Sequence, residues 1–458
     1  MKFICLLLLL IFSLPNGVQW RKKITLWVIL AIGMIAGPWV RTSFSQTPAP
    51  EQSKNILLMN GIAHIGNGEV LENSVIGFEK GTIILVANAK TIKIDRTKYD
   101  TIIYVEGKHI YPGFISVNST LGLTEIDAVR ATRDFNDVGG INPHVRSEIA
   151  YNSESKIIPT VRSNGVLLAQ ATPRGGLVSG TSSVMELEGW NWEDAVYKKD
   201  DGIHLNWPAM FQGGGWWAEP EPMKKNEKNK EQVLQLKGFF EDAKAYSRVA
   251  NHEERNLRLE AMRGIFDGSK TLFIHADFVK EIIQAVNFAK ENEVKKMVLV
   301  GGYDSWRVTD MLKENNIAVI LKRVHELPAR EDEDVDLPFK IPFLLQKAGV
   351  LFCLDNSGDM EAMNSRNLPF YAGTAAAYGL TTEQALMSIT SNTAKILGID
   401  KTTGTLEPGK DATLVISSGD ALDMRTNNIE YAFIRGKSID LDNHQKALYR
   451  KYKRKYEK

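Results

Sequence analysis

The 458-residue sequence has little of several features that mark specialised proteins. It contains two cysteines, Cys5 in the N-terminal leader and Cys353 in an expected strand, so no intramolecular disulfide framework can hold the mature fold together. The formal net charge is only +1, which excludes a bulk electrostatic attraction to nucleic acid. Repeats and low-complexity stretches are also missing, which argues against a purely structural envelope protein. What remains is the composition of a globular protein, 43% hydrophobic and 24% charged.

The first 46 residues have the composition of a targeting segment. Residues 4–12 are apolar, a basic Arg-Lys-Lys run follows, and a second apolar run at 24–40 precedes small polar residues at 42–46. A basic region, an apolar core and a short polar end describe a secretory signal peptide. The second run, about 17 residues long, could instead remain as a membrane anchor, since it is near the lower length limit for spanning. We therefore predict export to the periplasm or cell envelope, either after cleavage near Ser45 or with residues 24–40 retained as an anchor.

Short runs rich in β-branched residues, separated by turn residues, indicate strands over much of the chain. They occupy residues 55–108 and return within 399–440, so the two ends are expected to form one small β-sandwich. Between them, at 109–398, strand-like runs alternate with helix-period segments, as repeated βα units require. Residues 216–262 interrupt this alternation, and we expect an insertion over the open end of the strands. The expected strands are 56–59, 74–78, 82–86, 91–94, 101–105, 412–416 and 431–434 near the ends, and 110–117, 165–171, 182–187, 202–207, 271–276, 296–302, 317–321 and 349–355 in the centre.

Six segments resemble, in order, the motifs of one enzyme superfamily. Residues 109–122, HIYPGFISVNSTLG, resemble the first barrel strand of metal-dependent amidohydrolases, which typically reads PGfIDvHsHlG. The chain thus resembles an imidazolonepropionase-like member of the amidohydrolase superfamily. That resemblance implies a (β/α)8 TIM barrel over residues 109–398, joined to a β-sandwich formed by both ends. The other matches are LFIHA at 272–276, MVLVGG at 297–302, VLFCLDN at 350–356, ALMSITSNTAKILG at 385–398 and GTLEPGKDATLV at 404–415.

The same motifs lack most of the superfamily's metal ligands. Asn118 and Thr120 stand where the first strand has its two histidines, and Gly301 stands where strand 6 often has another. An amide and a hydroxyl are poor ligands for zinc compared with imidazole. The resemblance leaves His275 and Asp355, at the ends of strands 5 and 8, as metal ligands. We therefore expect no metal, or a single weakly bound divalent ion, preferably zinc.

His275 and Asp355 are also the candidate catalytic pair, because barrel chemistry takes place at the C-terminal ends of the strands. A carboxylate that orients an imidazole could make it a general base toward water. The alternative is a hydrogen-bonded pair that was retained after activity was lost. Asn118 and Thr120 share one face by alternation along the strand and are candidates to hold a substrate carbonyl. His204 is interpreted as a packed residue, although it and Glu186 are the next candidates if metal is bound.

Three further features are candidate binding elements. Trp216 and Trp217 follow a glycine-rich loop and could form an apolar lid, or could simply be packed in a tight loop. Arg130 could bind a substrate carboxylate, or could belong to a surface helix of ion pairs. The tail at 441–458 is basic with interleaved tyrosines. It is either a solvated helix or a surface that contacts an anionic membrane.

The resemblance implies a hydrolase that acts on carbon–nitrogen bonds other than peptide bonds. The missing histidines leave a second interpretation open, a catalytically inactive barrel that binds a ligand or serves as a subunit beside a related amidohydrolase. In both interpretations the partner is a small molecule, nucleic acid is not expected, and association with another copy or with a relative is an open alternative. Metal content should separate the two, because the usual mechanism needs metal to lower the pKa of water.

Overall fold

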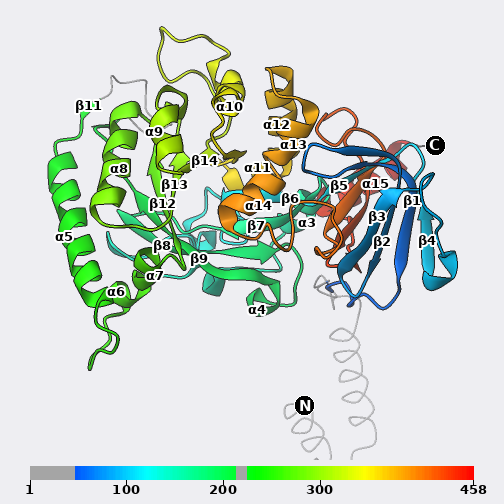
Figure 1. Ribbon diagram of the computed structural model, residues 1–458, viewed down its shortest axis with the longest axis horizontal. Helices are drawn as coiled ribbons and strands as arrows, with labels where there is room; N and C mark the ends of the chain where they lie inside the picture. Colours follow the sequence, from blue (N-terminus) through cyan, green and yellow to red (C-terminus); the bar gives the residue numbers. More distant parts are fainter. Residues whose placement is uncertain (1–46, 213–223, 458) are drawn as a thin grey trace, which may run out of the picture. The chain divides into compact units, whose positions relative to one another are not determined.

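The computed structural model describes residues 47–212 and 224–457 (Figure 1). The chain divides into a segment that ends at Thr47 and a compact unit, Pro48–Lys458. The clusters of buried apolar side chains lie inside this unit, so it carries its own hydrophobic cores. The predicted targeting segment, residues 1–46, lies outside the described residues.

A sheet of eight strands forms a nearly closed barrel in this unit (Figure 1). Most of its strands are parallel, and the largest apolar cluster is built around them. One strand, β8, pairs antiparallel with both of its neighbours. The expected mixed α/β barrel is present, but the strict (β/α)8 alternation fails at β8, which follows the preceding strand through a short loop instead of a helix. In sheet order the strands are β15 (Phe352–Leu354), β14 (Ala318–Leu321), β13 (Met297–Gly301), β12 (Thr271–Ala276), β9 (Val196–Asn206), β8 (Val178–Glu186), β7 (Val166–Ala171) and β6 (Phe114–Ser119).

Helices cover the outside of the barrel (Figure 1). In α8 (Val279–Glu291), Ile282, Ala285, Val286 and Ala289 recur at helical spacing and are buried, so one apolar face packs on the strands. The helix-period segments at 277–292 and 305–315 contain α8 and, after a 3-10 turn, α9. The others are α3 (Ile158–Arg162), α4 (Trp192–Ala195), α6 (Leu257–Ala261), α7 (Arg263–Asp267), α9 (Thr309–Glu314), α10 (Leu337–Ala348), α11 (Glu361–Asn364), α12 (Leu368–Ala377), α13 (Thr382–Met387) and α14 (Ser391–Leu397), with 3-10 turns at Arg96–Lys98, Arg130–Thr132, Ser147–Ala150, Ser305–Arg307 and Ser365–Asn367.

The turn between α13 and α14 fills the gap between the first and last barrel strands. Backbone N of Leu354 in β15 donates to the carbonyl of Ser388 at 3.1 Å. Backbone N of Ile115 in β6 donates to the carbonyl of Ile389 at 2.9 Å. These bonds take the place of a direct ladder between β6 and β15, so the barrel is closed by an inserted turn.

The described part of the predicted insertion includes a helix that packs on the side of the barrel. α5 (Asn229–Ser247) buries Phe240, whose ring meets Phe288 of α8 nearly edge-on, with centroids 4.7 Å apart. The remainder of the predicted lid, with Trp216 and Trp217, lies outside the described residues. That segment falls between the short strands β10 (Phe211–Gln212) and β11 (Lys224–Lys225).

Strands from both ends of the chain form a second sheet, here called the terminal sheet, around one shared core. Leu58 and Ile76 from the N-terminal part pack with Leu414 and Phe433 from the C-terminal part. The prediction that both ends of the chain form one β-sandwich is therefore confirmed in part, because their strands join in a single sheet. Residues 91–94, expected to be a strand, are not in one. Its strands are β18 (Lys437–Ser438), β17 (Ile429–Ile434), β16 (Leu414–Ser417), β5 (His109–Pro112), β1 (Ile56–His64), β2 (Val70–Glu79) and β3 (Thr82–Asn88), with β4 (Thr101–Tyr104) paired to β1.

Gly113 is the point at which the chain leaves the terminal sheet and enters the barrel. The single strand predicted at 110–117 is divided there into β5 and β6. A Cβ atom on Gly113 would lie 2.9 Å from Cδ1 of Leu167 and 3.0 Å from Cγ2 of Thr413. A Cβ atom here would force these side chains to shift, so glycine suits this close approach of the two sheets.

The last helix, α15 (His444–Tyr456), has no buried residue. Asn443 caps it by accepting a hydrogen bond from the backbone N of Lys446 at 2.8 Å. Within residues 47–212 and 224–457, no helix combines the length and apolar content needed to cross a membrane.

Candidate functional site

The C-terminal ends of the parallel barrel strands surround a cavity of about 350 Å³. These ends carry the chemistry in barrels of this kind. Its walls are mostly polar, which suits a small molecule that can form hydrogen bonds. The side chains that line it include Asn118, Asn206, Trp207, His275, Asp277, Glu281, Lys322, Glu326 and Ser357.

His275 lines this cavity and pairs with a second histidine, His204, buried behind it on the neighbouring strand. Nδ1 of His204 in β9 and Nε2 of His275 in β12 are 2.9 Å apart and share a hydrogen bond. The ring of His204 stacks on Phe273, with centroids 4.7 Å apart. Burial, followed by the charge of Arg174, lowers the pKa of His275 to about 3. Burial also lowers the pKa of His204 far below its usual value, so both imidazoles are neutral at neutral pH.

A buried polar layer holds His204 from its other side. Nε2 of His204 lies 3.0 Å from Oγ of Ser182, and that hydroxyl donates to Oδ1 of Asp201 at 2.7 Å. Because the serine proton is used on Asp201, His204 must donate from Nε2 and accept at Nδ1. His275 then donates from Nε2, which leaves a lone pair on its Nδ1. Nδ1 of His275 is therefore available to accept a hydrogen bond from a ligand.

Asp201 also connects this layer to the first barrel strand. Burial raises the pKa of Asp201 to about 6, against the lowering effect of its bond from Ser182. Nε2 of Gln170 donates to Oδ2 of Asp201 at 2.7 Å. Oε1 of Gln170 accepts from the backbone N of Asn118 at 3.0 Å. A continuous chain of hydrogen bonds thus runs from His275 to Asn118 through β8 and β7.

Asn118 occupies one of the positions at which the resemblance expects a histidine. Its φ of +49° interrupts the regular alternation of β6, so the shared face predicted for Asn118 and Thr120 is lost. Nδ2 of Asn118 donates to Oδ2 of Asp355 at 2.8 Å. Oγ1 of Thr120 is buried and has no hydrogen-bond partner in the described part of the chain. Asn118 therefore connects to the predicted carboxylate and Thr120 does not.

Arg174, in the loop after β7, brings a positive charge to this point. Its Nη1 donates to Oδ1 of Asn118 at 3.0 Å, and its Nη2 donates to the backbone carbonyl of Asn118 at 2.7 Å. Nη2 also lies 3.0 Å from Oε2 of Glu361. Both ends of the Asn118 amide are thus engaged, one by a guanidinium and the other by Asp355.

Asp355 is enclosed by hydrogen-bond donors and does not contact His275. Its Oδ1 accepts from the backbone N and the hydroxyl of Ser357, at 2.8 Å and 2.7 Å. Burial raises the pKa of Asp355 to about 6, while the bonds from Asn118 and Ser357 lower it. The partner of His275 is His204 instead, a contact that the sequence did not indicate.

These residues do not fit the metal that the resemblance implies. Nε2 of His275 is bonded to His204, and both oxygens of Asp355 accept bonds from protein groups. Across residues 47–212 and 224–457, no group of three His, Cys, Asp or Glu side chains could hold a metal ion. A catalytic zinc site uses three protein ligands, so no metal-dependent step is derived for this site.

The absence of a side chain at Gly301 does not leave empty space at the cavity. Its φ is +92°, and a Cβ atom would lie 2.7 Å from Oδ1 of Asp277. A histidine at this position would be strained in its backbone and would collide with that carboxylate. The space beside Gly301 is therefore taken by Asp277.

The other predicted candidates lie away from the cavity. Arg130 is exposed in the 3-10 turn Arg130–Thr132, where a surface helix was expected. Glu186 ends β8, and because that strand is antiparallel, Glu186 lies at the opposite end of the barrel, 2.8 Å from Nε of Arg435. Glu186 is therefore not positioned to hold a metal with His275.

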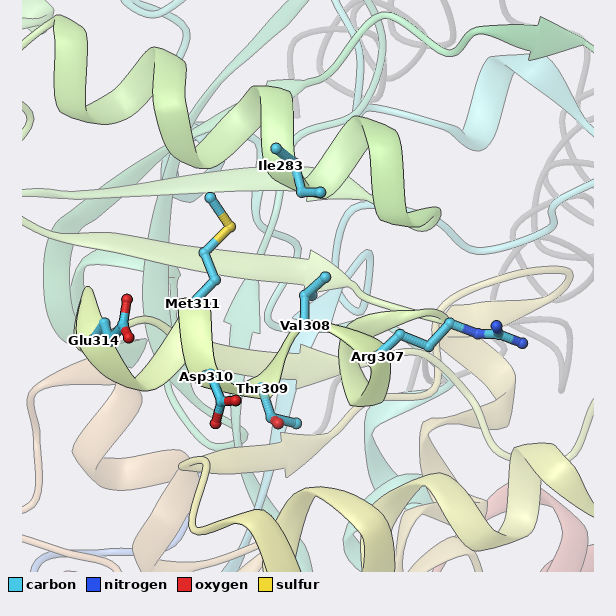
Figure 2. Close-up of a pocket in the computed structure, with 7 residues that line it drawn as sticks. All are labelled: Ile283, Arg307, Val308, Thr309, Asp310, Met311 and Glu314. Atoms are coloured by element: carbon cyan, nitrogen blue, oxygen red, sulfur yellow. The ribbon is translucent and has the colours of Figure 1, made fainter.

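A second hollow, of about 380 Å³, lies between α8 and α9 and shares no lining residue with the barrel cavity. Figure 2 shows Ile283 of α8 and Met311 of α9 pointing toward one another, with Arg307 directed away from them. Its floor is apolar and its rim carries Asp310 and Glu314. It offers none of the convergent hydrogen-bond donors and acceptors seen at the strand ends.

Sequence reasoning missed most of the residues that hold this network together. Gln170, Ser182 and Asp201 are fully or almost fully buried. A polar residue within a buried strand needs a partner, and that signal was present in the sequence. The signal for Arg174 was its place in the Pro-Arg-Gly-Gly loop that follows β7.

Comparison with known proteins identifies the family. No curated protein matches the sequence. Among solved structures, an amidohydrolase from Thermotoga maritima MSB8 is 22% identical with a TM-score of 0.72, covering 84% of this chain and 99% of that chain. A putative prolidase from Bifidobacterium longum is 16% identical with a TM-score of 0.51, covering 88% and 100%. An adenosine deaminase from Xanthomonas campestris with bound zinc is 13% identical with a TM-score of 0.50, covering 89% and 98%.

At these identities the solved structures show a common fold and no more. The family model is more specific, because the model named "Amidohydrolase family" matches residues 167–439, which is more than half of the 458-residue chain. That match runs from the second residue of β7 through β15 and the C-terminal strands of the terminal sheet. The chain therefore belongs to the amidohydrolase family.

Proposed function

We propose that this chain binds a small polar molecule at the mouth of its barrel without a resident metal. The observation that supports this proposal is the Arg174–Asn118–Asp355 chain of hydrogen bonds, which stands where the resemblance expects metal ligands. A guanidinium supplies positive charge there as a fixed part of the protein. The cavity beside it, about 350 Å³ in volume, has the size of a small-molecule site.

The groups around the cavity favour a ligand with both hydrogen-bond donors and acceptors. Nζ of Lys322 lies 3.1 Å from Oε2 of Glu326 and 3.8 Å from Oδ2 of Asp277. A ligand carboxylate or carbonyl could therefore bind Lys322, while a ligand N–H group could donate to Asp277 or to Nδ1 of His275. An amide-containing or zwitterionic molecule satisfies both requirements.

Hydrolysis of a carbon–nitrogen bond other than a peptide bond is the second candidate function. Family membership and the position of His275 on the cavity favour it. Without metal, the imidazole would have to activate water. A base with a pKa of about 3 is far from the best value for general base catalysis at neutral pH, so binding is the better supported function.

Metal analysis of the purified full chain tests the proposal directly. After dialysis we expect well below one zinc per chain, because two side chains leave a tetrahedral ion half-coordinated. One or more tightly held metals per chain, with activity that depends on them, would contradict metal-free binding and favour the hydrolase.

A ligand screen is the second test of the proposed function. N-acyl amino acids, dipeptides and cyclic imides should include compounds that raise the melting temperature of the wild type but not of Lys322→Ala, with Arg130→Ala as a surface control. If a compound is hydrolysed without metal, His275→Ala should lower turnover by about 10²- to 10⁴-fold, the contribution of a general base. Asp355→Asn tests whether that carboxylate, which bonds Asn118 and Ser357 and not His275, takes part separately. Full turnover in both folded variants would exclude this pair from the reaction.

A further inference from the structure

The C-terminal helix α15 is an amphipathic helix that contacts the rest of the protein near its first turn, at α3. Every residue from His444 to Tyr456 is exposed. Leu448 is 37% exposed, and Tyr449, Tyr452 and Tyr456 are 65%, 52% and 75% exposed. Side chains spaced three, four and seven residues apart share one helix face. These four therefore form a continuous apolar and aromatic stripe, here called the tyrosine stripe.

Positive charge flanks the tyrosine stripe. The helix contains six Lys and Arg residues and no acidic residue. Some of these cations are paired, because Arg450 lies 2.5 Å from Asp442 and Lys453 lies 3.1 Å from Glu457. Lys451, Arg454 and Lys455 form no ion pair with residues that the structure describes. Lys451 and Lys455 lie over the rings of Tyr452 and Tyr456, 5.5 Å and 5.2 Å from the ring centroids. These charges are therefore not neutralised by a carboxylate and lie beside the tyrosine rings.

Such a helix gains little stability from the rest of the protein. Helices of about 12 to 15 residues are marginal in water unless a face packs against something. Like charges four residues apart, such as Lys451 and Lys455, further destabilise it. Its polar contact with the body is made by Gln445, whose Oε1 accepts from Oγ1 of Thr160 at 2.7 Å. A surface that buries the stripe and neutralises the flanking charge would offset this deficit.

We propose that α15 is a docking surface for an anionic lipid membrane. Tyrosine side chains place an apolar ring and a polar hydroxyl at the membrane–water boundary, and lysine side chains extend from an apolar stem to the headgroups. Aromatic residues on one face and cations along its edges are the composition of helices that lie in the interfacial plane. Nucleic acid would use the cations but would leave the stripe in water, so the stripe favours lipid.

The experiment uses the unit of residues 48–458, which contains its own cores and omits the N-terminal apolar runs. Binding is measured by flotation with phosphatidylcholine vesicles, and with vesicles that contain about one third phosphatidylglycerol. We expect binding to the anionic vesicles only. The charge variant Lys451→Gln/Arg454→Gln/Lys455→Gln should lower the partition coefficient about 100-fold, since each cation near an anionic surface contributes about tenfold or less.

A second variant and a matched control separate the stripe from bulk charge. Tyr449→Ser/Tyr452→Ser/Tyr456→Ser keeps every cation and should weaken binding at least tenfold. The control Lys90→Gln/Lys93→Gln/Lys98→Gln removes the same charge from exposed positions of the terminal sheet region and should bind as the wild type does. Equal binding by the wild type and both α15 variants, equal binding to neutral vesicles, or tighter binding to an oligonucleotide than to anionic vesicles would overturn the proposal.

Discussion

The molecule contains two histidine pairs with nearly the same local geometry. In the barrel mouth, Nδ1 of His204 and Nε2 of His275 are 2.9 Å apart; in the terminal sheet, Nε2 of His64 and Nδ1 of His109 are also 2.9 Å apart. One ring of each pair stacks on an aromatic side chain. His204 stacks on Phe273 at 4.7 Å, and His64 stacks on a tyrosine at 4.4 Å.

The two pairs differ in their third partner. Nδ1 of His64 lies 2.6 Å from Oε1 of Glu383 in α13, so this pair ties the terminal sheet to a barrel helix through a carboxylate. His204 instead meets the hydroxyl of Ser182, and the nearest carboxylate, Asp201, is one step further away. His64 is therefore bonded directly to a carboxylate at the structural junction, whereas the two imidazoles of the mouth pair bond to one another and to a serine hydroxyl. This difference teaches that a histidine at a barrel mouth need not be paired with a carboxylate that would make it a stronger base.

Removing the central histidine of each pair should produce the largest difference between them. His204 is fully buried, so His204→Ala leaves a cavity and removes the hydrogen-bond partner of His275, although Ser182 keeps its bond to Asp201. We expect the free energy of unfolding to fall by about 3 to 4 kcal/mol. His64 is 8% exposed and its partner Glu383 is partly exposed, so water can reach the groups left behind and His64→Ala should cost about 1 to 2 kcal/mol. Urea denaturation of both variants measures these losses.

His444→Ala is the control, because His444 is exposed at the start of α15 and its loss should stay within about 0.5 kcal/mol of the wild type. An equal loss in His204→Ala and His64→Ala would mean that the third partner does not distinguish the two pairs.

Lowering the pH should reduce the free energy of unfolding through His275, by less than the loss expected for His204→Ala. His275 has a pKa of about 3 when folded and about 6.5 when unfolded, so the unfolded state takes up a proton first as the pH falls. Its contribution is complete above pH 6.5 and is lost as the pH falls toward 3. Asp355, with its pKa raised to about 6, acts in the opposite direction, because its folded form retains a proton between about pH 3.8 and 6.

The variant His275→Gln removes the contribution of His275 to the pH dependence of stability and leaves the contribution of Asp355 unchanged. Between pH 8 and pH 5, the wild type should lose about 1 to 2 kcal/mol more than this variant. In the terminal sheet, His109 is half-buried and its pKa is lowered by burial and by His64, so His109→Gln should change the pH dependence less. Parallel stability curves for the wild type and His275→Gln would show that the folded pKa of His275 is not depressed.

The fold could be predicted from the sequence wherever local patterns were sufficient. The β-branched runs at 271–276 and 296–302 became β12 and β13, and the periodic segment between them became α8. The reversed direction of β8 could not be predicted, since the pattern of a buried strand is the same in both directions. The division of one predicted strand at Gly113 depends on Leu167 and Thr413, which approach from distant parts of the chain.

The site was predicted less completely for the same reason. His275, Asp355 and Asn118 could be named from motifs, because each motif is local. Their connections could not, because the partner of His275 is on β9 and the partner of Asn118 is in the loop after β7. Hydrogen bonds between strands depend on register, and the sequence of one strand does not state the register of the next.

The smallest expected effect concerns the helix that supplies the terminal pair with its carboxylate. Thr381 caps α13 in a capping box: backbone N of Gln384 donates to Oγ1 of Thr381 at 3.2 Å, and backbone N of Thr381 donates to Oε1 of Gln384 at 3.0 Å. Thr381→Ala should cost about 1 kcal/mol and loosen Glu383, while Thr381→Ser should retain the cap. Ligand binding at the mouth should not change in either variant, because no hydrogen bond of the mouth network involves α13. If Thr381→Ser loses as much stability as Thr381→Ala, the hydroxyl is not the stabilising group. If Thr381→Ala weakens ligand binding, the two histidine pairs are coupled through the barrel and are not independent.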